Sequence, residues 1–364
     1  MQIDFHHAVT YVLSRLAGFV HPDAVIIAYA AQYVDDAQNR GTIHFVDGRS
    51  YDHIASSHEV LDPKNLVPQE DYEVWVPFHF LPGNAGEPRG LGLEVPLERR
   101  LTCLPDSPLA TDMLKAAIAT RGQLGSLHRL GITTHVYADT WAHQRFSGER
   151  HHINHALDET HEGFEERAKT TGIANAVGLG HGAVSVHPDQ PFRIWKYINW
   201  QGVPVPRPNP DIFLHACERI FEFHLAYRGE GGARSLSSAD RSVLQASLAG
   251  FTSEDENDRH RRWLDLVHSG AFSFGALTDA ERQDLEYIPK GVGSWKYAAL
   301  GTTAKIDTGD EQYVYQESFE TSNWKLFHDA LKAHQAQVLR EIMPAYGLPP
   351  SAEALAAMRA AKTN

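Results

Sequence analysis

Three side chains of metal-binding type are spaced four residues apart in the segment THVYADTWAHQRFSG, residues 134–148. They are His135, Asp139 and His143. Four residues advance an α-helix by about 40° beyond a full turn, so the three side chains share one helix face. Neutral imidazole nitrogen and ionised carboxylate oxygen are ligands of zinc, iron and manganese. The spacing predicts a helix that offers part of a metal site; the alternative is a set of packed or capped polar residues.

A closed metal site needs ligands from elsewhere in the chain, and three segments before the motif offer them. His6 and His7 begin the first predicted helix, and because adjacent side chains point in different directions at most one is a ligand. Asp35 and Asp36 end an apolar helix, where a carboxylate opposes the helix dipole and a cation or solvent must compensate it. His79 lies between two phenylalanines, where a buried imidazole needs a metal or a backbone carbonyl as partner.

Two segments after the motif compete to complete the site. His181 and Asp189 lie in the glycine-flanked stretch GLGHGAVSVHPDQPF, residues 178–192. His155 and Glu159 have helical spacing in a segment whose charge is typical of a solvated surface helix. Because function commonly resides in loops held by a rigid scaffold, the first pair is favoured.

Apolar residues recur at helical spacing through most of the chain, which predicts an all-α fold with the metal site at the centre of a helical bundle. A small β-hairpin is expected near 42–51, around Asp47–Gly48, and an ordered loop over 74–90. Residues 1–228 are expected to form a metal-binding helical core and 229–364 an accessory helical region packed on it, within one structural domain. The expected helices are 7–19, 22–38, 107–145 with a break near Gly131, 211–228, 278–288 with a Thr278…Glu281 capping box, and 322–343.

Charge and composition exclude several classes of protein. The net charge of −13 argues against a general nucleic-acid surface, because phosphate affinity is built from excess Lys and Arg. No segment approaches the roughly 18 apolar residues of a membrane span. The two cysteines, Cys103 and Cys217, form no zinc motif and are expected to be free thiols. The N-terminal residues lack the pattern of a signal peptide, so a cytoplasmic location is expected.

The phrases DFH, AYAAQYVDD, PFHFLPG, THVYADTWAHQ and GHG…HPDQPF…W resemble those of a bacterial family of unknown function over most of residues 4–225. The order of candidate ligands is distantly similar to the zinc-dependent phospholipase C and single-strand nuclease superfamily. That resemblance implies an all-α enzyme whose three-metal cluster hydrolyses phosphodiesters. Carried over by position, it assigns the ligands to His6 or His7, Asp36 or Asp35, His79, His135, Asp139 as the bridging carboxylate, His143, and then His181 with Asp189 or His155 with Glu159.

The expected function is that of a metal-dependent hydrolase acting on a phosphoester of a small molecule through a di- or trinuclear site. Asp139 would bridge the metals, and Asp35, or Asp36 if Asp35 is a ligand, would hold the attacking water. Zinc is the expected metal, with iron or manganese as alternatives. Two other readings are a non-haem iron enzyme and a non-catalytic protein with a structural metal, because ligand types alone do not separate zinc from iron.

Overall fold

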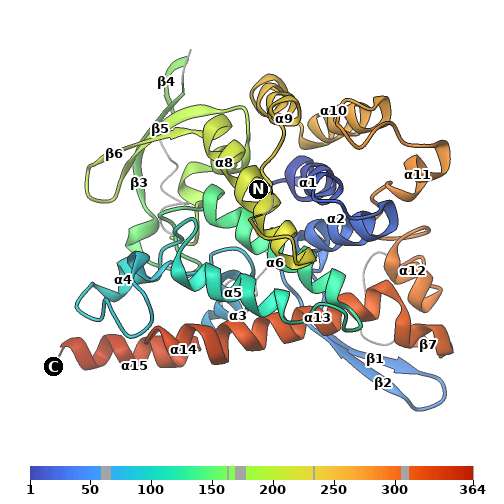
Figure 1. Ribbon diagram of the computed structural model, residues 1–364. Coiled ribbons are helices and arrows are strands. Elements are labelled where there is room, and N and C mark those ends of the chain that lie inside the picture. Colours follow the sequence, from blue (N-terminus) through green and yellow to red (C-terminus); the bar gives the residue numbers. More distant parts are fainter. Residues whose placement is uncertain (59–66, 162–163, 169–177, 233, 305–310, 364) are drawn as a thin grey trace.

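The computed structural model describes residues 1–58, 67–161, 164–168, 178–232, 234–304 and 311–363, and their fold is mainly helical (Figure 1). The α-helices are α1 (Thr10–Leu16), α2 (His21–Asp36), α3 (Pro68–Phe78), α4 (Leu97–Arg100), α5 (Pro108–Ile118), α6 (Ser126–Ala142), α8 (Asn209–Arg228), α9 (Ser238–Gly250), α10 (Glu256–Ser269), α11 (Asp279–Asp284), α12 (Trp295–Leu300), α13 (Asn323–Gln337), α14 (Met343–Ala345) and α15 (Ala352–Thr363). Two segments are π-helical, η1 (Asp4–Val9) and η8 (Val338–Ile342). Short 3₁₀ turns are η3 (Asn84–Gly86), η4 (His152–Asn154), η5 (Gly182–Val184), η6 (His187–Asp189) and η7 (Glu317–Thr321).

The expectation of a mainly helical fold with a small β-hairpin is confirmed, but a second sheet that was not expected also accompanies the helices. The hairpin expected near 42–51 is confirmed as β1 (Gly41–Phe45) and β2 (Ser50–His53), and β7 (Gln312–Tyr313) pairs with β1 in parallel. A second sheet has the strand order β4-β3-β5-β6 and is antiparallel throughout. Its strands are β3 (Ala156–His161), β4 (Phe164–Ala168), β5 (Ile194–Asn199) and β6 (Pro204–Pro208).

Helices α2 and α6 form the central pair, and a glycine sets how closely they approach. A Cβ atom added at Gly131 would lie 2.4 Å from the carbonyl oxygen of Ile27 and 2.7 Å from the Cβ of Ala30. The break expected near Gly131 is therefore wrong, because Gly131 lies inside α6. The chain turns instead between α5 and α6, where Gly125 adopts the left-handed backbone (φ 79°) that glycine favours.

The remaining helices pack around this pair. In Figure 1, α1 and α2 lie beside α10 and α11, and α13, η8, α14 and α15 run along one side of the molecule. One hydrophobic cluster includes Val12, Phe213, Trp263, Met343 and Leu355, so it joins early and late parts of the chain. The division at residue 228 stays a prediction. The Thr278…Glu281 capping box is confirmed at α11, whereas α3 occupies the first part of the loop expected over 74–90.

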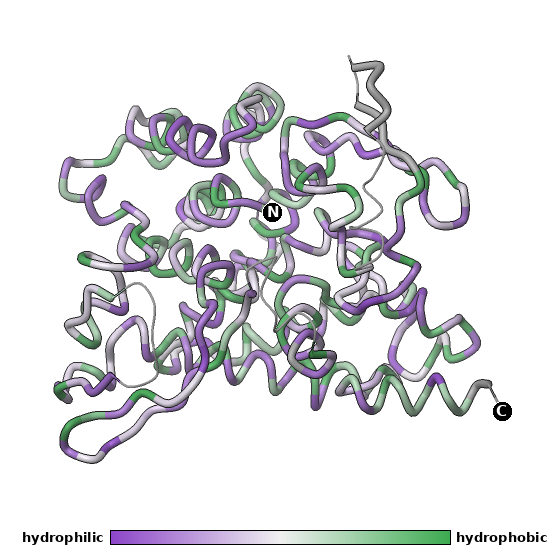
Figure 2. The backbone as a smooth tube through the Cα atoms, turned by 180° about the vertical axis from the view of Figure 1, so that it is seen from behind, coloured by the Kyte–Doolittle hydropathy of each residue, from purple (hydrophilic) through white to green (hydrophobic). Residues whose placement is uncertain are grey.

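Hydrophilic and hydrophobic residues alternate along most helices, as expected for helices with one buried and one exposed face (Figure 2). Among the residues described, none of the helices combines the length and the apolar character that crossing a membrane requires.

We expect Gly131→Ala to destabilise the protein by about 1–3 kcal/mol, because the added methyl group overpacks the α2–α6 contact. Gly250→Ala is the matched control. It also lies in a helix, but no atom lies within 4 Å of the added Cβ, so the free energy of unfolding should change by less than about 1 kcal/mol. Denaturant unfolding measures both. Equal losses in the two variants would contradict the close approach of α2 and α6.

Candidate metal centre

The carboxylate of Asp139, on α6, lies at the centre of a buried cluster of histidines and acids. Asp139 is 1% exposed, and its charge must be balanced inside the fold. Its Oδ1 lies 2.5 Å from the Met1 amino nitrogen and 3.2 Å from His6 Nε2, and its Oδ2 lies 3.3 Å from His79 Nδ1, 3.3 Å from His135 Nε2 and 3.6 Å from His143 Nδ1. Segments far apart in the sequence therefore meet at one carboxylate.

Three groups of side chains around this carboxylate have the geometry to hold a cation. Within each group, one ligand atom per residue lies within 4.8 Å of the others. The groups are His6, Asp35 and His135; His79, His135 and Asp139; and His143, His181 and Asp189. His135 belongs to two of them, so the first two groups are contiguous.

Hydrogen bonds to backbone carbonyls fix the tautomers of four of these histidines. A carbonyl oxygen only accepts, so the ring nitrogen that contacts it carries the proton and the other nitrogen of the neutral ring presents a lone pair. The donors are His135 Nδ1 to Ala31 (2.8 Å), His79 Nε2 to Ser56 (2.9 Å), His143 Nδ1 to His79 (2.7 Å) and His181 Nδ1 to Ser185 (2.8 Å). This pattern of carbonyl-bound rings is how proteins orient metal-binding histidines.

The lone pairs of these rings point at other lone pairs. His135 Nε2 lies 3.3 Å from both His79 Nδ1 and Asp139 Oδ2, and His181 Nε2 lies 3.3 Å from Asp189 Oδ2. Burial lowers the pKa of His135 to about 4, and burial likewise lowers that of His181 to about 4, so both rings are neutral near pH 7. Neutral nitrogens facing carboxylate oxygens without a proton between them repel. A cation between them removes the repulsion, and so the donor set fits a metal.

His6 gives a second sign that the cluster suits a cation. Its ring is completely buried, and neither ring nitrogen forms a hydrogen bond within the described ranges. It stacks on His135 with 3.8 Å between ring centroids. Burial, reinforced by His135, lowers the pKa of His6 well below its ordinary value. A buried neutral ring with no hydrogen-bond partner costs free energy unless another ligand takes its lone pair.

The charged groups of the cluster influence one another strongly. Burial raises the pKa of the Asp35 carboxyl well above its usual range, and the neighbouring Asp139 raises it further. Burial also acts against ionisation of Asp139, but His143 and the Met1 ammonium group hold its pKa well below the usual range. Burial alone would lower the pKa of the Met1 amino group, yet Asp139, Asp189 and Asp35 together raise it to about 11. The centre therefore attracts positive charge.

The structure separates the adjacent candidates at both helix ends. His6 faces Asp139, whereas His7 Nδ1 lies 2.9 Å from Nε2 of His260 and belongs to none of the three groups. Asp35 Oδ1 lies 3.8 Å from both His79 Nδ1 and His135 Nε2. The sequence left His6 and His7 as alternative ligands, and the structure places His7 away from the centre.

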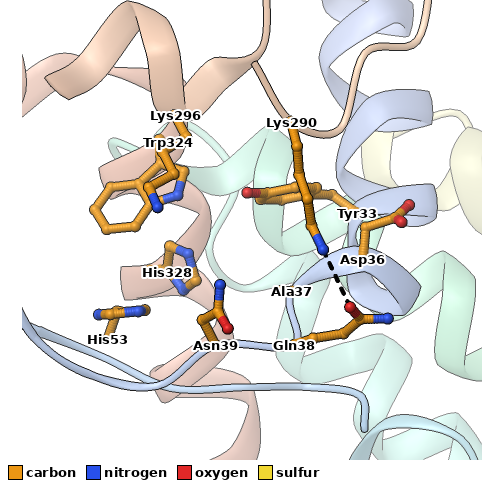
Figure 3. Close-up of a pocket in the computed structure, with 10 residues that line it drawn as sticks. All are labelled: Tyr33, Asp36, Ala37, Gln38, Asn39, His53, Lys290, Lys296, Trp324 and His328. Carbon is orange, nitrogen blue, oxygen red and sulfur yellow. Dashed lines mark hydrogen bonds between the residues drawn. The ribbon is translucent and has the colours of Figure 1, made fainter. Parts of the chain in front are cut away.

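Asp36 is likewise directed elsewhere. Its Oδ2 accepts hydrogen bonds from the Tyr287 hydroxyl (2.6 Å) and from Gln32 Nε2 (3.2 Å). Figure 3 shows Asp36 at one side of a small cavity of about 20 Å³, across the view from His53 and His328. Asp36 is absent from the three ligand groups of the described residues, so Asp35 takes the place at the centre.

Of the two rival pairs after the motif, His181 and Asp189 reach the centre. His181 Nε2 lies 3.3 Å from Asp189 Oδ2, and Asp189 Oδ1 lies 3.2 Å from the Met1 amino nitrogen. His155 follows η4, and Glu159 is part of β3 rather than of a helix. The side chain of Glu159 lies outside the described residues.

Glycine 180 allows the His181 loop to approach. Its φ of +52° is left-handed, and a Cβ there would lie 2.4 Å from the ring of Phe80. The same ring stacks on His143 with 4.6 Å between centroids. Phe80 therefore forms part of an apolar wall beside the third group.

Several positioning residues are invisible to the spacing argument. Asn209 Nδ2 donates to the carbonyls of His187 and Gln190, 2.8 Å each, and so fixes the turn that carries Asp189. The buried guanidinium of Arg207 donates to the carbonyls of Trp141 and Ala142 and caps the end of α6 next to His143. The spacing argument could not find them, because Arg207 lies in β6 and Asn209 is the first residue of α8.

The N-terminal segment is held by α10. Arg259 Nε donates to Asp4 Oδ2 at 2.7 Å, and both side chains are 0% exposed. Arg259 Nη1 also donates to the carbonyl of Ser253 at 2.6 Å. This ion pair fixes η1, and with it the position of His6.

Comparison with known proteins identifies the family. The model of the "Family of unknown function (DUF6765)" matches residues 1–342. The chain belongs to this family. No curated protein and no solved structure matches this chain.

We expect His135→Ala to lower the metal content of this family member and its thermal stability in the presence of metal, because binding to a folded site is linked to folding. Elemental analysis and thermal melts with and without chelator measure both. The control is His224→Ala. His224 is equally buried and is bonded to Thr134 and Ser14, but it lies outside the three groups. Its loss should lower stability and leave metal content unchanged, and equal metal content in all three proteins would refute the assignment.

We expect Arg259→Ala to destabilise the protein by about 3–5 kcal/mol, because it leaves the Asp4 carboxylate buried without a partner. Arg261→Ala on the same helix is the control. Its pair with Asp258 is exposed, so the loss should stay below about 1 kcal/mol. Urea unfolding distinguishes the two, and similar losses would show that the Arg259 pair does not anchor η1.

Proposed function

We propose that this protein is a metal-dependent hydrolase that cleaves a phosphoester at a di- or trinuclear centre of histidines and aspartates. The observation that carries the proposal is the set of carbonyl-bound imidazoles whose free lone pairs converge on Asp139, Asp189 and one another. Three such groups in contact favour a multinuclear centre over a single structural ion, which needs only four ligands.

The charge around the centre supports an anionic substrate bound through metal ions. No lysine or arginine side chain among the described residues forms a hydrogen bond or ion pair with the histidines and acids of the three groups. A phosphoryl group would therefore be held by the metals rather than by basic side chains. Bound divalent ions lower the pKa of water and stabilise the charge that develops on phosphoryl oxygens. The distant resemblance to phospholipase C-like enzymes points to the same chemistry.

The acids have different exposures, which suggests different roles. The Asp139 side chain is 1% exposed and touches groups from several segments, as expected for a bridging ligand. The Asp35 side chain is 31% exposed, so it lies at the rim, where it would orient an attacking water and accept its proton. The Asp189 side chain, 11% exposed, would hold a metal together with His181.

We expect metal-free protein to regain hydrolysis of 4-nitrophenyl phosphate or bis(4-nitrophenyl) phosphate when zinc, manganese or ferrous iron is added. Asp139→Asn should abolish activity, because a neutral amide bridges cations poorly. Asp35→Asn should lower kcat by roughly 10²–10⁴-fold, the usual contribution of a general base.

The control for these variants is Asp36→Asn. An amide oxygen still accepts from Tyr287 and Gln32, so metal content and activity should stay close to those of the unmodified protein. A metal-replete protein that hydrolyses neither ester contradicts the proposal. Oxygen consumption by the ferrous form, without ester hydrolysis, would replace it with the non-haem iron reading.

A further inference from the structure

A second cavity, of about 300 Å³, lies outside the three ligand groups, beside the segment that follows α6. Its walls come from α4 and the residues after it, from the segment after α6, and from the turn between β5 and β6. The lining residues include Arg99, Cys103, Arg145, Tyr197 and Trp200. This volume is typical of the lower end of small-molecule sites.

The cavity is positively charged in a protein whose net charge is −13. Arg99 and Arg145 line it, and none of its lining residues is acidic. Both arginines are exposed. In the part of the chain that the structure describes, neither guanidinium forms a hydrogen bond or an ion pair. Two uncompensated guanidinium groups at one concave surface form a receptor for an anionic group.

The backbone holds Arg145 in a conformation that non-glycine residues rarely adopt. Its φ is 75°, in the left-handed region. The amide of Arg145 donates to the carbonyl of Cys103 at 2.9 Å, and the amide of Cys103 donates to the carbonyl of Phe146 at 2.8 Å. These paired bonds fix the strained residue between two neighbours. Strain that the surroundings maintain is found preferentially at ligand sites.

A third arginine adds to the positive potential from behind the cavity wall. Arg207 is 1% exposed, and its Nε and Nη1 have no hydrogen-bond partner. It forms no ion pair within the described residues. Burial lowers the pKa of Arg207 to about 10, while Tyr197 and Asp189 act to raise it and the nearby charge of Arg145 acts to lower it. An anion in the cavity would be attracted by all three guanidinium groups.

Aromatic side chains supply the other half of the lining. Trp200 is half-buried and contacts His152 edge to face, with 4.9 Å between ring centroids. Tyr197 is 2% exposed and stacks on Phe146 with 5.4 Å between centroids. Tyr197 also stacks on Trp195, so its ring supports the cavity wall and the half-buried indole of Trp200 is the surface open to a ligand. An indole beside arginines favours a ligand with a planar ring, through stacking and cation–π contacts.

We propose that this cavity binds a small organic anion that carries a planar ring together with a phosphate or carboxylate group. Arg99 and Arg145 bind the anionic group, and Trp200 contacts the ring. The inference does not depend on the proposed hydrolase function. Arg145 follows His143 by two residues, so the site adjoins the candidate metal centre without using its ligands.

The experiment measures binding of phenyl phosphate and benzoate by calorimetry and by tryptophan fluorescence. Inorganic phosphate and benzyl alcohol serve as the anion-only and ring-only probes. Each titration is repeated in the Asp139→Asn protein, so that binding at the metal centre is separated from binding in the cavity. We expect saturable binding of at least one aromatic anion in both proteins, tighter than either single-feature probe.

Arg145→Gly is the decisive variant, because glycine keeps the left-handed backbone while it removes the guanidinium. It should weaken binding by roughly tenfold or more, as should Arg99→Ala. Trp200→Phe should remove most of the fluorescence change and retain calorimetric binding. The control is Arg340→Ala, which removes an exposed arginine outside the cavity and should bind as the unmodified protein does.

Three results would overturn the proposal. The first is the absence of saturable binding of either aromatic anion. The second is unchanged affinity in both Arg145→Gly and Arg99→Ala. The third is equal affinity for inorganic phosphate and phenyl phosphate, which would reject the ring contact. Circular dichroism of each variant shows whether it is folded. If Arg145→Gly does not fold, Arg99→Ala still tests the proposal.

Discussion

The buried carboxylate of Asp139 is the constraint around which the structure is organised. An ionised carboxylate that is 1% exposed is tolerated only when cationic or hydrogen-bonding groups surround it. Here those groups come from η1, from His79 directly after α3, from α6 and from the amino group of Met1. Other contacts hold the elements that carry these groups in place. Gly131 lets α2 approach α6, Arg207 caps α6, and Arg259 fixes η1.

The part of the centre that sequence could predict is the part that one regular helix determines. His135, Asp139 and His143 share a face because helical geometry alone dictates it, and α6 contains or directly precedes all three. Sequence could not choose between His6 and His7, or between Asp35 and Asp36. Adjacent residues differ by about 100° around a helix, so only one of each pair can face the centre. For η1, which is a π-helix, the α-helical spacing of apolar residues does not indicate which side chain that is.

The rest depends on contacts between distant segments. The pairing of Met1 with Asp139 spans 138 residues, and that of Arg259 with Asp4 spans 255, so no local spacing reports them. The strands of the second sheet were missed because β3 carries two consecutive acids, Asp158 and Glu159, which also suit an exposed helix, and β6 contains three prolines. Gly131 was misread because a glycine that permits close helix packing looks like a glycine that ends a helix.

The Asp4–Arg259 pair also limits when η1 can be buried during synthesis of the chain. The acid emerges from the ribosome first, and its partner follows 255 residues later. At a synthesis rate of about 5–20 residues per second, this interval is roughly 13–50 s. Throughout it Asp4 must stay hydrated, so η1 cannot settle into its buried position. Although η1 is made long before α10, it can therefore take its buried position only after α10 has been synthesised and Arg259 can pair with Asp4.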